Sequence, residues 1–346
     1  MKFRNIIKNI TIIALSVALM FCGYYYHKTE QELSYLNSVL NKNPLLKSCF
    51  THYRKNAFMQ RGGEYLPNYE HPRTLNDKVA YYLENYFFKS PITKVIGTKY
   101  FAKKYVADIV GNEHVVQLLG VWDNPEDINW DLLPNKFVLK TVRGNFGREV
   151  ILVSDKSKLN VSGMVKQLRF LCENTPGIKE FKIDNKRIIA EELLEPEGND
   201  LIDYKFFCSF GKPLVAYCLA MKKNSETDVD SKTFSFYSVP EWKRLYIKAD
   251  THGFNNIPKP KNYIKMIELC EKLSKPFPLI RIDLYEIGDR VLVGEITEDA
   301  GGGKSIMNPV IWDFKLGENI PVLSTEEIQT LIERDKIVAN KYLTEE

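Results

Sequence analysis

From about residue 115 onward, hydrophobic residues come in short runs separated by turn-forming residues. Gly211-Lys212 and Gly288-Asp289 each stand between two such runs, which is typical of β-hairpins. Hairpins with interspersed helices predict an α+β fold with mainly antiparallel sheets. The expected helices lie at about 161–173, 261–274 and 324–340, and the expected strands are Val115–Leu119, Phe137–Leu139, Val150–Val153, Ile188–Ala190, Tyr204–Phe210, Leu214–Leu219, Leu279–Tyr285 and Val291–Ile296.

The preceding region has helical periodicity instead. Thr74 followed by Asp77 resembles a helix start. A second helix is expected to begin at Pro91 and to continue to Val110, with one apolar side. Its other side carries lysines, for which a solvated face is the simplest interpretation: Lys94, Lys99, Lys103 and Lys104.

The N-terminal segment has the pattern of a membrane anchor. Lys2, Arg4 and Lys8 precede an uncharged, largely apolar run from Asn9 to Tyr26. At about 1.5 Å per residue this run spans roughly 27 Å, enough to cross a bilayer core. No small-x-small sequence follows it, so an uncleaved anchor is favoured over a cleaved signal peptide. We therefore expect a single-pass protein of the cell (inner) membrane, with a short tail at 1–8, a transmembrane anchor at 9–27 and a helical neck at 28–70.

The composition is that of an ordinary globular protein of 346 residues, with 44% hydrophobic and 27% charged residues. The 48 basic and 44 acidic residues leave a net charge of +4, too balanced for a nucleic-acid partner to be expected. The cysteines form no CxxC pair, so neither structural zinc nor a disulfide framework is expected. Cys208 and Cys218 are expected to be buried thiols.

One segment looks like the end of a phosphate-binding P-loop, namely Gly303-Lys304-Ser305. The position that should hold the first glycine of that motif is Glu298, and Asn308-Pro309 interrupts the helix that should follow. The segment is therefore expected to be a Gly-rich loop of another kind.

Lys140 lies at the end of an apolar strand and precedes the turn Arg143-Gly144-Asn145-Phe146-Gly147. A lysine beside a Gly-containing turn is suited to holding phosphate oxygens, with its ammonium and with free backbone N–H groups. The alternative is a surface lysine before a hairpin.

Charged residues also interrupt two neighbouring apolar strands. Arg281 and Asp283 alternate with aliphatic residues, so both are expected on one face. Pairing about the Gly288-Asp289 turn brings Glu295 approximately opposite Asp283. Two carboxylates and an arginine on one face are costly unless paired or bound to metal, and such oxygens suit Mg²⁺. The alternative is a structural ion pair.

A further polar insertion, Asp203-Tyr204-Lys205, opens the next strand, and a strand from Arg187 to Leu194 runs into an acidic linker before it. The order of these segments resembles the ATP-grasp fold. More narrowly, it resembles the TupA-like group, which is associated with teichuronopeptide and other surface-polysaccharide biosynthesis. The resemblance covers about 70–320, and its further segments are Arg73-Thr74-Leu75-Asn76-Asp77-Lys78, Leu118-Leu119-Gly120-Val121-Trp122, Asp155-Lys156-Ser157-Lys158-Leu159 and Asp203-Tyr204-Lys205-Phe206-Phe207-Cys208.

The resemblance implies two α+β subdomains with mainly antiparallel sheets around a nucleotide cleft that holds ATP and Mg²⁺. The ATP-grasp region would occupy 71–320, with subdomains at about 111–194 and 195–320 and a C-terminal helix at 321–346. Asp283 and Glu295 would bind magnesium, and Arg281 and Lys205 would act in catalysis. The implied nucleotide-binding residues are Lys140, Arg143, Gly144, Glu191, Glu192, Leu193, Leu194, Asp203 and Lys205.

Enzymes of this fold typically convert a carboxylate to an acyl phosphate, which an amine then attacks. The resemblance thus implies a membrane-anchored carboxylate–amine ligase whose partners are an amine and a carboxylate-bearing sugar or polysaccharide precursor. Two features differ from the expected pattern: Thr297 stands where many such ligases have Asn, and the turn at 143–147 is not of the His-Gly-Ser-Gly type. The alternatives are a glycosyl- or phosphoryl-transferase on the same scaffold and a catalytically degenerate assembly module.

Two expectations about the membrane conflict. The positive flank of the anchor lies on its N-terminal side, which favours a body outside the cytoplasm. ATP, in contrast, is a cytoplasmic ligand. The sequence therefore points to opposite sides of the membrane.

Overall fold

The computed structural model describes residues 67–142, 150–174, 187–196, 200–222, 233–249, 256–303 and 307–344. All of them belong to the second of the chain's two compact units, Pro67–Glu346. The expected anchor at 9–27 and the turn at 143–147, with Arg143 and Gly144, lie outside the described residues. Within the described residues, none of the helices combines the length and the hydrophobicity needed to cross a bilayer.

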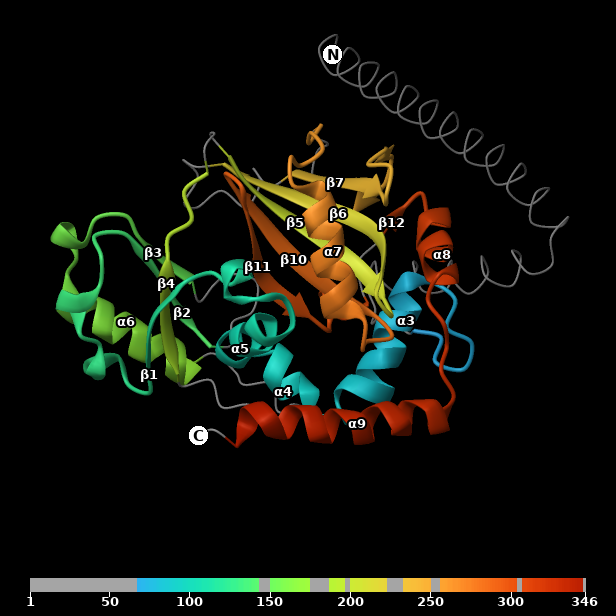
Figure 1. Ribbon diagram of the computed structural model, residues 1–346, viewed down its shortest axis with the longest axis horizontal. Helices are drawn as coiled ribbons and strands as arrows, with labels where there is room; N and C mark the ends of the chain where they lie inside the picture. The colour runs from blue at the N-terminus through green and yellow to red at the C-terminus, as the bar shows by residue number, and fades with distance from the viewer. Residues whose placement is uncertain are drawn as a thin grey trace, which may run out of the picture. The chain divides into compact units, whose positions relative to one another are not determined.

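The smaller sheet has four strands in the order β1-β4-β2-β3, and each neighbouring pair is antiparallel. Helix α6 (Val161–Asn174) lies beside this sheet (Figure 1). Its Leu168 shares a core with Phe137, Leu139 and Ile188. The strands are β1 (Leu118–Trp122), β2 (Phe137–Thr141), β3 (Val150–Val153) and β4 (Ile188–Glu192).

The larger sheet has six strands in the order β11-β10-β5-β6-β7-β8, again with antiparallel neighbours. Helix α7 (Tyr263–Ser274) lies against it in Figure 1, and its Met266 and Cys270 are fully buried in the same core. Cys208 and Cys218 are buried free thiols, as predicted. The strands are β5 (Asp200–Ser209), β6 (Lys212–Lys222), β7 (Thr233–Ser238), β8 (Arg244–Leu245), β10 (Ile280–Ile287) and β11 (Arg290–Thr297).

Both predicted hairpins are confirmed. The β5–β6 turn contains Gly211 and the β10–β11 turn contains Gly288, with φ of 79° and 57°. Both values lie in the left-handed region that glycine adopts without a steric penalty. Together with the antiparallel pairing of both sheets, the hairpins confirm the predicted α+β fold class.

Further helices share the core of the larger sheet. Thr74 caps α3 through the predicted capping box with Asp77. The prediction of one helix from Pro91 to Val110 is wrong, because the helix is interrupted at Gly97 and Thr98. Thr98 is extended, and the break lets the Lys99 N–H donate to the Val142 carbonyl at 2.8 Å. The helices are α3 (Leu75–Tyr82), continued by a π-helical turn (Leu83–Phe87), α4 (Ile92–Ile96), α5 (Lys99–Val110), α8 (Ile311–Glu318) and α9 (Thr325–Leu343).

Helix α3 also fixes the end of the Gly-rich segment. The Asn76 side chain donates to Asp313 of α8 at 2.8 Å, and Lys78 donates to the Gly317 carbonyl at 2.5 Å. Gly303 packs so closely on α3 that a Cβ there would lie 2.4 Å from the Asn76 carbonyl oxygen. A short two-stranded sheet, β12 (Met307–Asn308) with β9 (Lys248–Ala249), follows instead of a P-loop helix. The remaining single turns of 3₁₀-helix are Asn112–His114, Pro125–Asp127, Trp130–Leu132 and Lys156–Lys158. Ala300–Gly303 is a turn with left-handed backbone at its three glycines.

Candidate functional site

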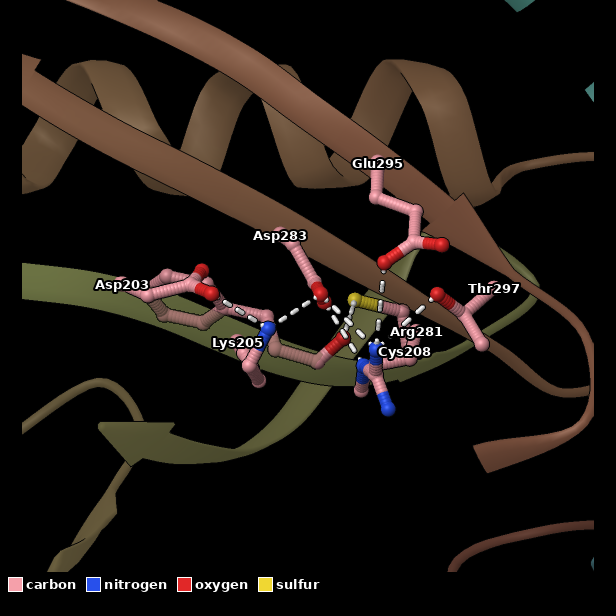
Figure 2. A network of polar contacts seen from close by, with 8 residues as sticks. Asp203, Lys205, Cys208, Arg281, Asp283, Glu295 and Thr297 are labelled. Atoms are coloured by element: carbon pink, nitrogen blue, oxygen red, sulfur yellow. Dashed lines mark hydrogen bonds and ion pairs between the residues drawn. The ribbon is translucent and has the colours of Figure 1, made fainter. Parts of the chain in front are cut away.

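A row of charged residues crosses three strands on one face of the larger sheet. Asp283 of β10 lies directly opposite Glu295 of β11 and opposite Lys205 of β5. Directly opposed residues of neighbouring strands point to the same face. The predicted opposition of Asp283 and Glu295 is therefore confirmed, and Lys205 joins them (Figure 2).

Arg281 and Asp283 form the centre of this cluster. The Arg281 Nε and Nη2 atoms lie 2.7 Å and 2.8 Å from the two carboxylate oxygens of Asp283, whose side chain is only 2% exposed. Their neighbours Ile280, Ile282 and Leu284 point into the core, as the alternating pattern predicts. The structural ion pair that the sequence left as an alternative is thus present.

Lys205 links Asp283 to Asp203. Its Nζ lies 2.5 Å from an oxygen of each carboxylate. Burial would raise the pKa of Asp283, but the charges of Arg281 and Lys205 outweigh burial and hold it below its usual value. Burial instead raises the pKa of Asp203 to about 6, against the pull of Lys205. The second oxygen of Asp203, Oδ1, is buried without a hydrogen-bond partner.

Glu295 forms the more open edge of the cluster, next to the buried Thr297. The Glu295 side chain is 49% exposed, and its Oε2 lies 3.7 Å from Arg281 Nη2. Arg281 Nη2 also donates to Thr297 Oγ1 at 3.0 Å (Figure 2). The hydroxyl of Thr297 therefore orients the arginine at the position where the resemblance would place Asn.

The carboxylates of this cluster are candidate ligands for a magnesium ion. Among the described residues, no group of three or more His, Cys, Asp or Glu side chains could hold a metal by itself. Both oxygens of Asp283 contact cations, whereas Glu295 is half-exposed. Mg²⁺ in proteins commonly keeps few carboxylate ligands and takes the rest from substrate phosphates and water. These residues thus fit a magnesium ion that arrives with a nucleotide, with Glu295 as the accessible ligand.

A second charged cluster lies where the smaller sheet meets helix α5. Glu191 is 4% exposed, and its Oε2 lies 2.5 Å from Lys140 Nζ while its Oε1 lies 3.0 Å from Lys103 Nζ. Burial would raise the pKa of Glu191, but the two lysines lower it. The expectation of a solvated lysine face is thus wrong for Lys103, because the carboxylate and the Val116 carbonyl, 2.8 Å away, hold it in the interior.

The remaining predicted nucleotide residues follow β4. Glu192 accepts from Arg290 at 2.7 Å and from the Gln117 backbone N–H at 3.0 Å, so it ties β4 to the β10–β11 turn. The hydrogen bond from Arg290 is the main cause of the lowered pKa of Glu192. Leu193 and Leu194 are half-buried after the end of the strand.

Both clusters border one small cavity between helix α5 and strand β11. The cavity has a volume of about 70 Å³, and Lys99, Lys103, Glu191, Glu295 and Thr297 are among its lining residues. The structure therefore places predicted residues of both sheets, together with two lysines that the sequence analysis had assigned to solvent, around one space.

The chain matches a known class of protein, the ATP-grasp proteins. The model of the TupA-like ATPgrasp family matches residues 82–321. The chain belongs to the TupA-like ATP-grasp family.

Several solved structures are similar to this chain at low sequence identity. D-alanine–D-alanine ligase from Helicobacter pylori is 16% identical over 66% of this chain, with a TM-score of 0.35, and the match covers 62% of that ligase. D-alanine–D-alanine ligase from Bacillus anthracis, complexed with ATP, is 14% identical over 71% of this chain and 68% of its own, with a TM-score of 0.39. Phosphoribosylamine–glycine ligase from Thermotoga maritima is 13% identical over 60% and 48% of the two chains, with a TM-score of 0.36. No curated protein sequence matches the chain.

Proposed function

We propose that this protein is an ATP-dependent carboxylate–amine ligase that uses Mg-ATP. The observation that carries the proposal is the buried Arg281–Asp283–Lys205 cluster beside the half-exposed Glu295, on one face of an antiparallel sheet. Such an arrangement offers fixed positive charge for phosphate oxygens and an accessible carboxylate for a metal ion. Membership of the TupA-like ATP-grasp family supports the proposal that the nucleotide is ATP.

In this proposal, residues of both charged clusters bind the nucleotide. Lys140 and Lys205 contact phosphate oxygens. Glu191 and the backbone from Glu192 to Leu194 receive the adenine, and the buried, unpaired Oδ1 of Asp203 accepts a donor from the nucleotide. Arg143 and Gly144, which lie outside the described residues, are further candidates for contact with the phosphates in this proposal.

The proposed reaction has two steps. A carboxylate oxygen of the substrate attacks the γ-phosphorus of ATP, the bond to the bridging oxygen breaks, and ADP leaves. The nitrogen of an amine then attacks the acyl carbon and an amide bond forms. Inorganic phosphate leaves with the electrons of the broken C–O bond and takes up the proton that the amine nitrogen loses. Arg281 and Lys205 stabilise the negative charge on the transferred phosphoryl group, because their ammonium and guanidinium groups are held in place before reaction.

A magnesium ion would supply charge neutralisation at the β- and γ-phosphates. Glu295 would hold it, with Asp283 as the neighbouring carboxylate. We further propose that the carboxylate belongs to a sugar or polysaccharide precursor and that the chain is anchored by 9–27 in the cell membrane. The resemblance of several segments to surface-polysaccharide proteins and the apolar N-terminal run support these two points.

Calorimetric titration of Mg-ATP into the full chain in mild detergent tests the proposal, followed by an assay of ADP and phosphate release with a uronic acid and an amine. We expect binding that requires magnesium and is lost in Asp283→Asn and Lys140→Ala. Amide product should form in proportion to ADP. A well-folded chain that binds no nucleotide would overturn the ligase, and nucleotide hydrolysis without amide would favour a transferase.

A further inference from the structure

The cluster around Glu191 contains two ammonium groups and one carboxylate. Lys140 of β2 contacts one oxygen of Glu191, and Lys103 of α5 contacts the other. The cluster thus carries one positive charge more than it needs to neutralise its own carboxylate. A surplus cation next to a proposed phosphate site is available for the phosphate only if it is able to leave the carboxylate.

Leaving is the difficult step for Lys140. Its Nζ lies 2.5 Å from Glu191, and the Glu191 side chain is almost completely buried. A buried carboxylate that loses its only counter-ion is strongly unfavourable, because nothing replaces the lost solvation. A phosphate would therefore have to compete with Glu191 for Lys140, unless a second cation remained on the carboxylate.

We propose that Lys103 is this second cation: it holds Glu191 in place and neutralised while Lys140 turns to the nucleotide phosphates. Lys103 is then a positioning residue, and the exchange of counter-ions at Glu191 is part of nucleotide binding. The proposal rests on the proposed function, because it assigns the phosphates to Lys140.

The geometry distinguishes the two lysines. Lys103 has a second acceptor, the Val116 carbonyl at 2.8 Å, and its side chain is 13% exposed. The Lys140 side chain is more open to solvent, and Glu191 is its partner in the structure. Lys103 is thus fixed from two sides, whereas Lys140 is the lysine that is able to move.

The protonation behaviour of the cluster agrees with this division. Burial lowers the pKa of Lys103, and the charge of Glu191 and its hydrogen bond oppose that effect. The pKa of Glu191 stays below its usual value because the two lysines outweigh its burial. Glu191 thus carries its negative charge before any nucleotide arrives, and it requires a cation at every stage.

The first test needs no nucleotide. The full chain in detergent is treated with acetic anhydride, and acetylation of Lys140 is followed by mass spectrometry. In Lys103→Met, Lys140 becomes the only counter-ion of Glu191, so its labelling rate should fall about threefold or more. In the double variant Lys103→Met/Glu191→Gln the charge that retains Lys140 is gone, and labelling should exceed the wild-type rate. Lys104→Met, which replaces the adjacent lysine on α5, is the matched control. Lys140 should be acetylated in this variant at the wild-type rate.

The second test measures Mg-ATP affinity in the same variants. Lys103→Met should weaken binding by about tenfold or more, the effect of withdrawing one charge-assisted contact from the phosphates. The double variant should recover most of this loss, a rescue that a merely structural role of Lys103 would not produce. Lys103→Arg keeps the charge and should stay close to wild type. Urea unfolding of each variant identifies any that does not fold.

Equal labelling of Lys140 in wild type and Lys103→Met, or a double variant no better than Lys103→Met in either test, would overturn the inference. If the wild type binds no ATP, the proposed function fails and the role of Lys103 in nucleotide binding fails with it. The labelling experiment still decides separately whether Lys103 frees Lys140 from Glu191.

Discussion

Lys205 and Asp283 are 78 positions apart in sequence, yet the Lys205 Nζ lies 2.5 Å from the Asp283 Oδ2 in the interior. The strand order places β5 beside β10, and the register sets the two residues directly opposite each other. Their side chains are almost completely buried, so each charge depends on the other and on the neighbouring Arg281 and Asp203. Removing one member should therefore affect both stability and ligand binding.

We predict that Lys205→Met lowers the free energy of unfolding by about 3 kcal/mol, because it leaves Asp203 and Asp283 buried without that cation. It should also weaken Mg-ATP binding, since a phosphate contact is lost. Urea denaturation and calorimetry measure the two effects. Lys243→Met, which removes an exposed lysine, is the control and should change neither quantity. A Lys205→Met protein as stable as the control would show that the buried pair contributes nothing to folding.

We predict that stability falls with rising pH between about 4 and 7 because of Asp313. Burial raises the pKa of this carboxyl to about 7, whereas it is 3.8 for an exposed aspartate. The folded state therefore binds a proton that the unfolded state has lost over this range, and this favours folding most at the acidic end. The contribution is on the order of 4 kcal/mol across the range, and it is constant above pH 7.

Asp313→Asn removes the titrating group and should reduce the slope of stability against pH between 4 and 7, whatever its effect on stability at one pH. Denaturant midpoints at several pH values give the slope. Asp289→Asn, at a surface turn, is the control. An unchanged slope in Asp313→Asn would mean that Asp313 is ionised in the folded protein throughout this range.

The Gly-rich segment offers a matched pair of glycines. Gly302 and Gly303 both have left-handed backbone, with φ of 63° and 68°, but only Gly303 packs against α3. Gly302→Ala should cost about 1 kcal/mol, from backbone strain alone. Gly303→Ala should cost several kcal/mol, because its Cβ would lie 2.4 Å from the Asn76 carbonyl oxygen. Equal melting temperatures for the two variants would contradict the contact with α3.

The proposed use of ATP predicts a cytoplasmic body, against the charge distribution around the N-terminal run. A fusion of a reporter that is fluorescent only in the cytoplasm to the C-terminus should therefore be fluorescent. The matched fusion to a phosphatase that is active only outside should be inactive. The opposite pattern would favour the charge rule and would require a source of ATP outside the cytoplasm.

Much of the site was predictable where it depended on local pattern. The alternation around Arg281 and Asp283 and the turn at Gly288-Asp289 suffice to bring Asp283 and Glu295 close together on neighbouring strands. The irregularity between Asp283 and Leu284 that sets Asp283 directly opposite Glu295, and not opposite Gly294, was not predicted. Thr74 and Asp77 likewise marked the start of α3, because a capping box is contained in four consecutive residues. These features need no knowledge of the tertiary fold.

The features of the site that could not be predicted from the sequence depend on contacts between distant segments. Lys205 lies opposite Asp283 only because β5 pairs with β10, and Lys103 reaches Glu191 only because α5 lies against β4. In sequence Lys103 is one lysine among several on a helix, and no local pattern distinguishes it from Lys104. The break at Gly97 was missed for a similar reason, since the Val142 carbonyl that favours it lies on another element.

The turn at Gly288 affects the row of charged residues without contacting it, because the turn helps to set the register of β10 and β11. Side chains alternate between the two faces of a sheet, so a shift of one residue sends Glu295 to the side of α7 and away from Asp283. With a single-residue insertion or deletion in that turn, β10 and β11 would still form a hairpin. Glu295 would then no longer lie on the same face as Asp283 and Lys205. In this family, length changes at the hairpin should therefore be tolerated far less than substitutions of the exposed turn residues themselves.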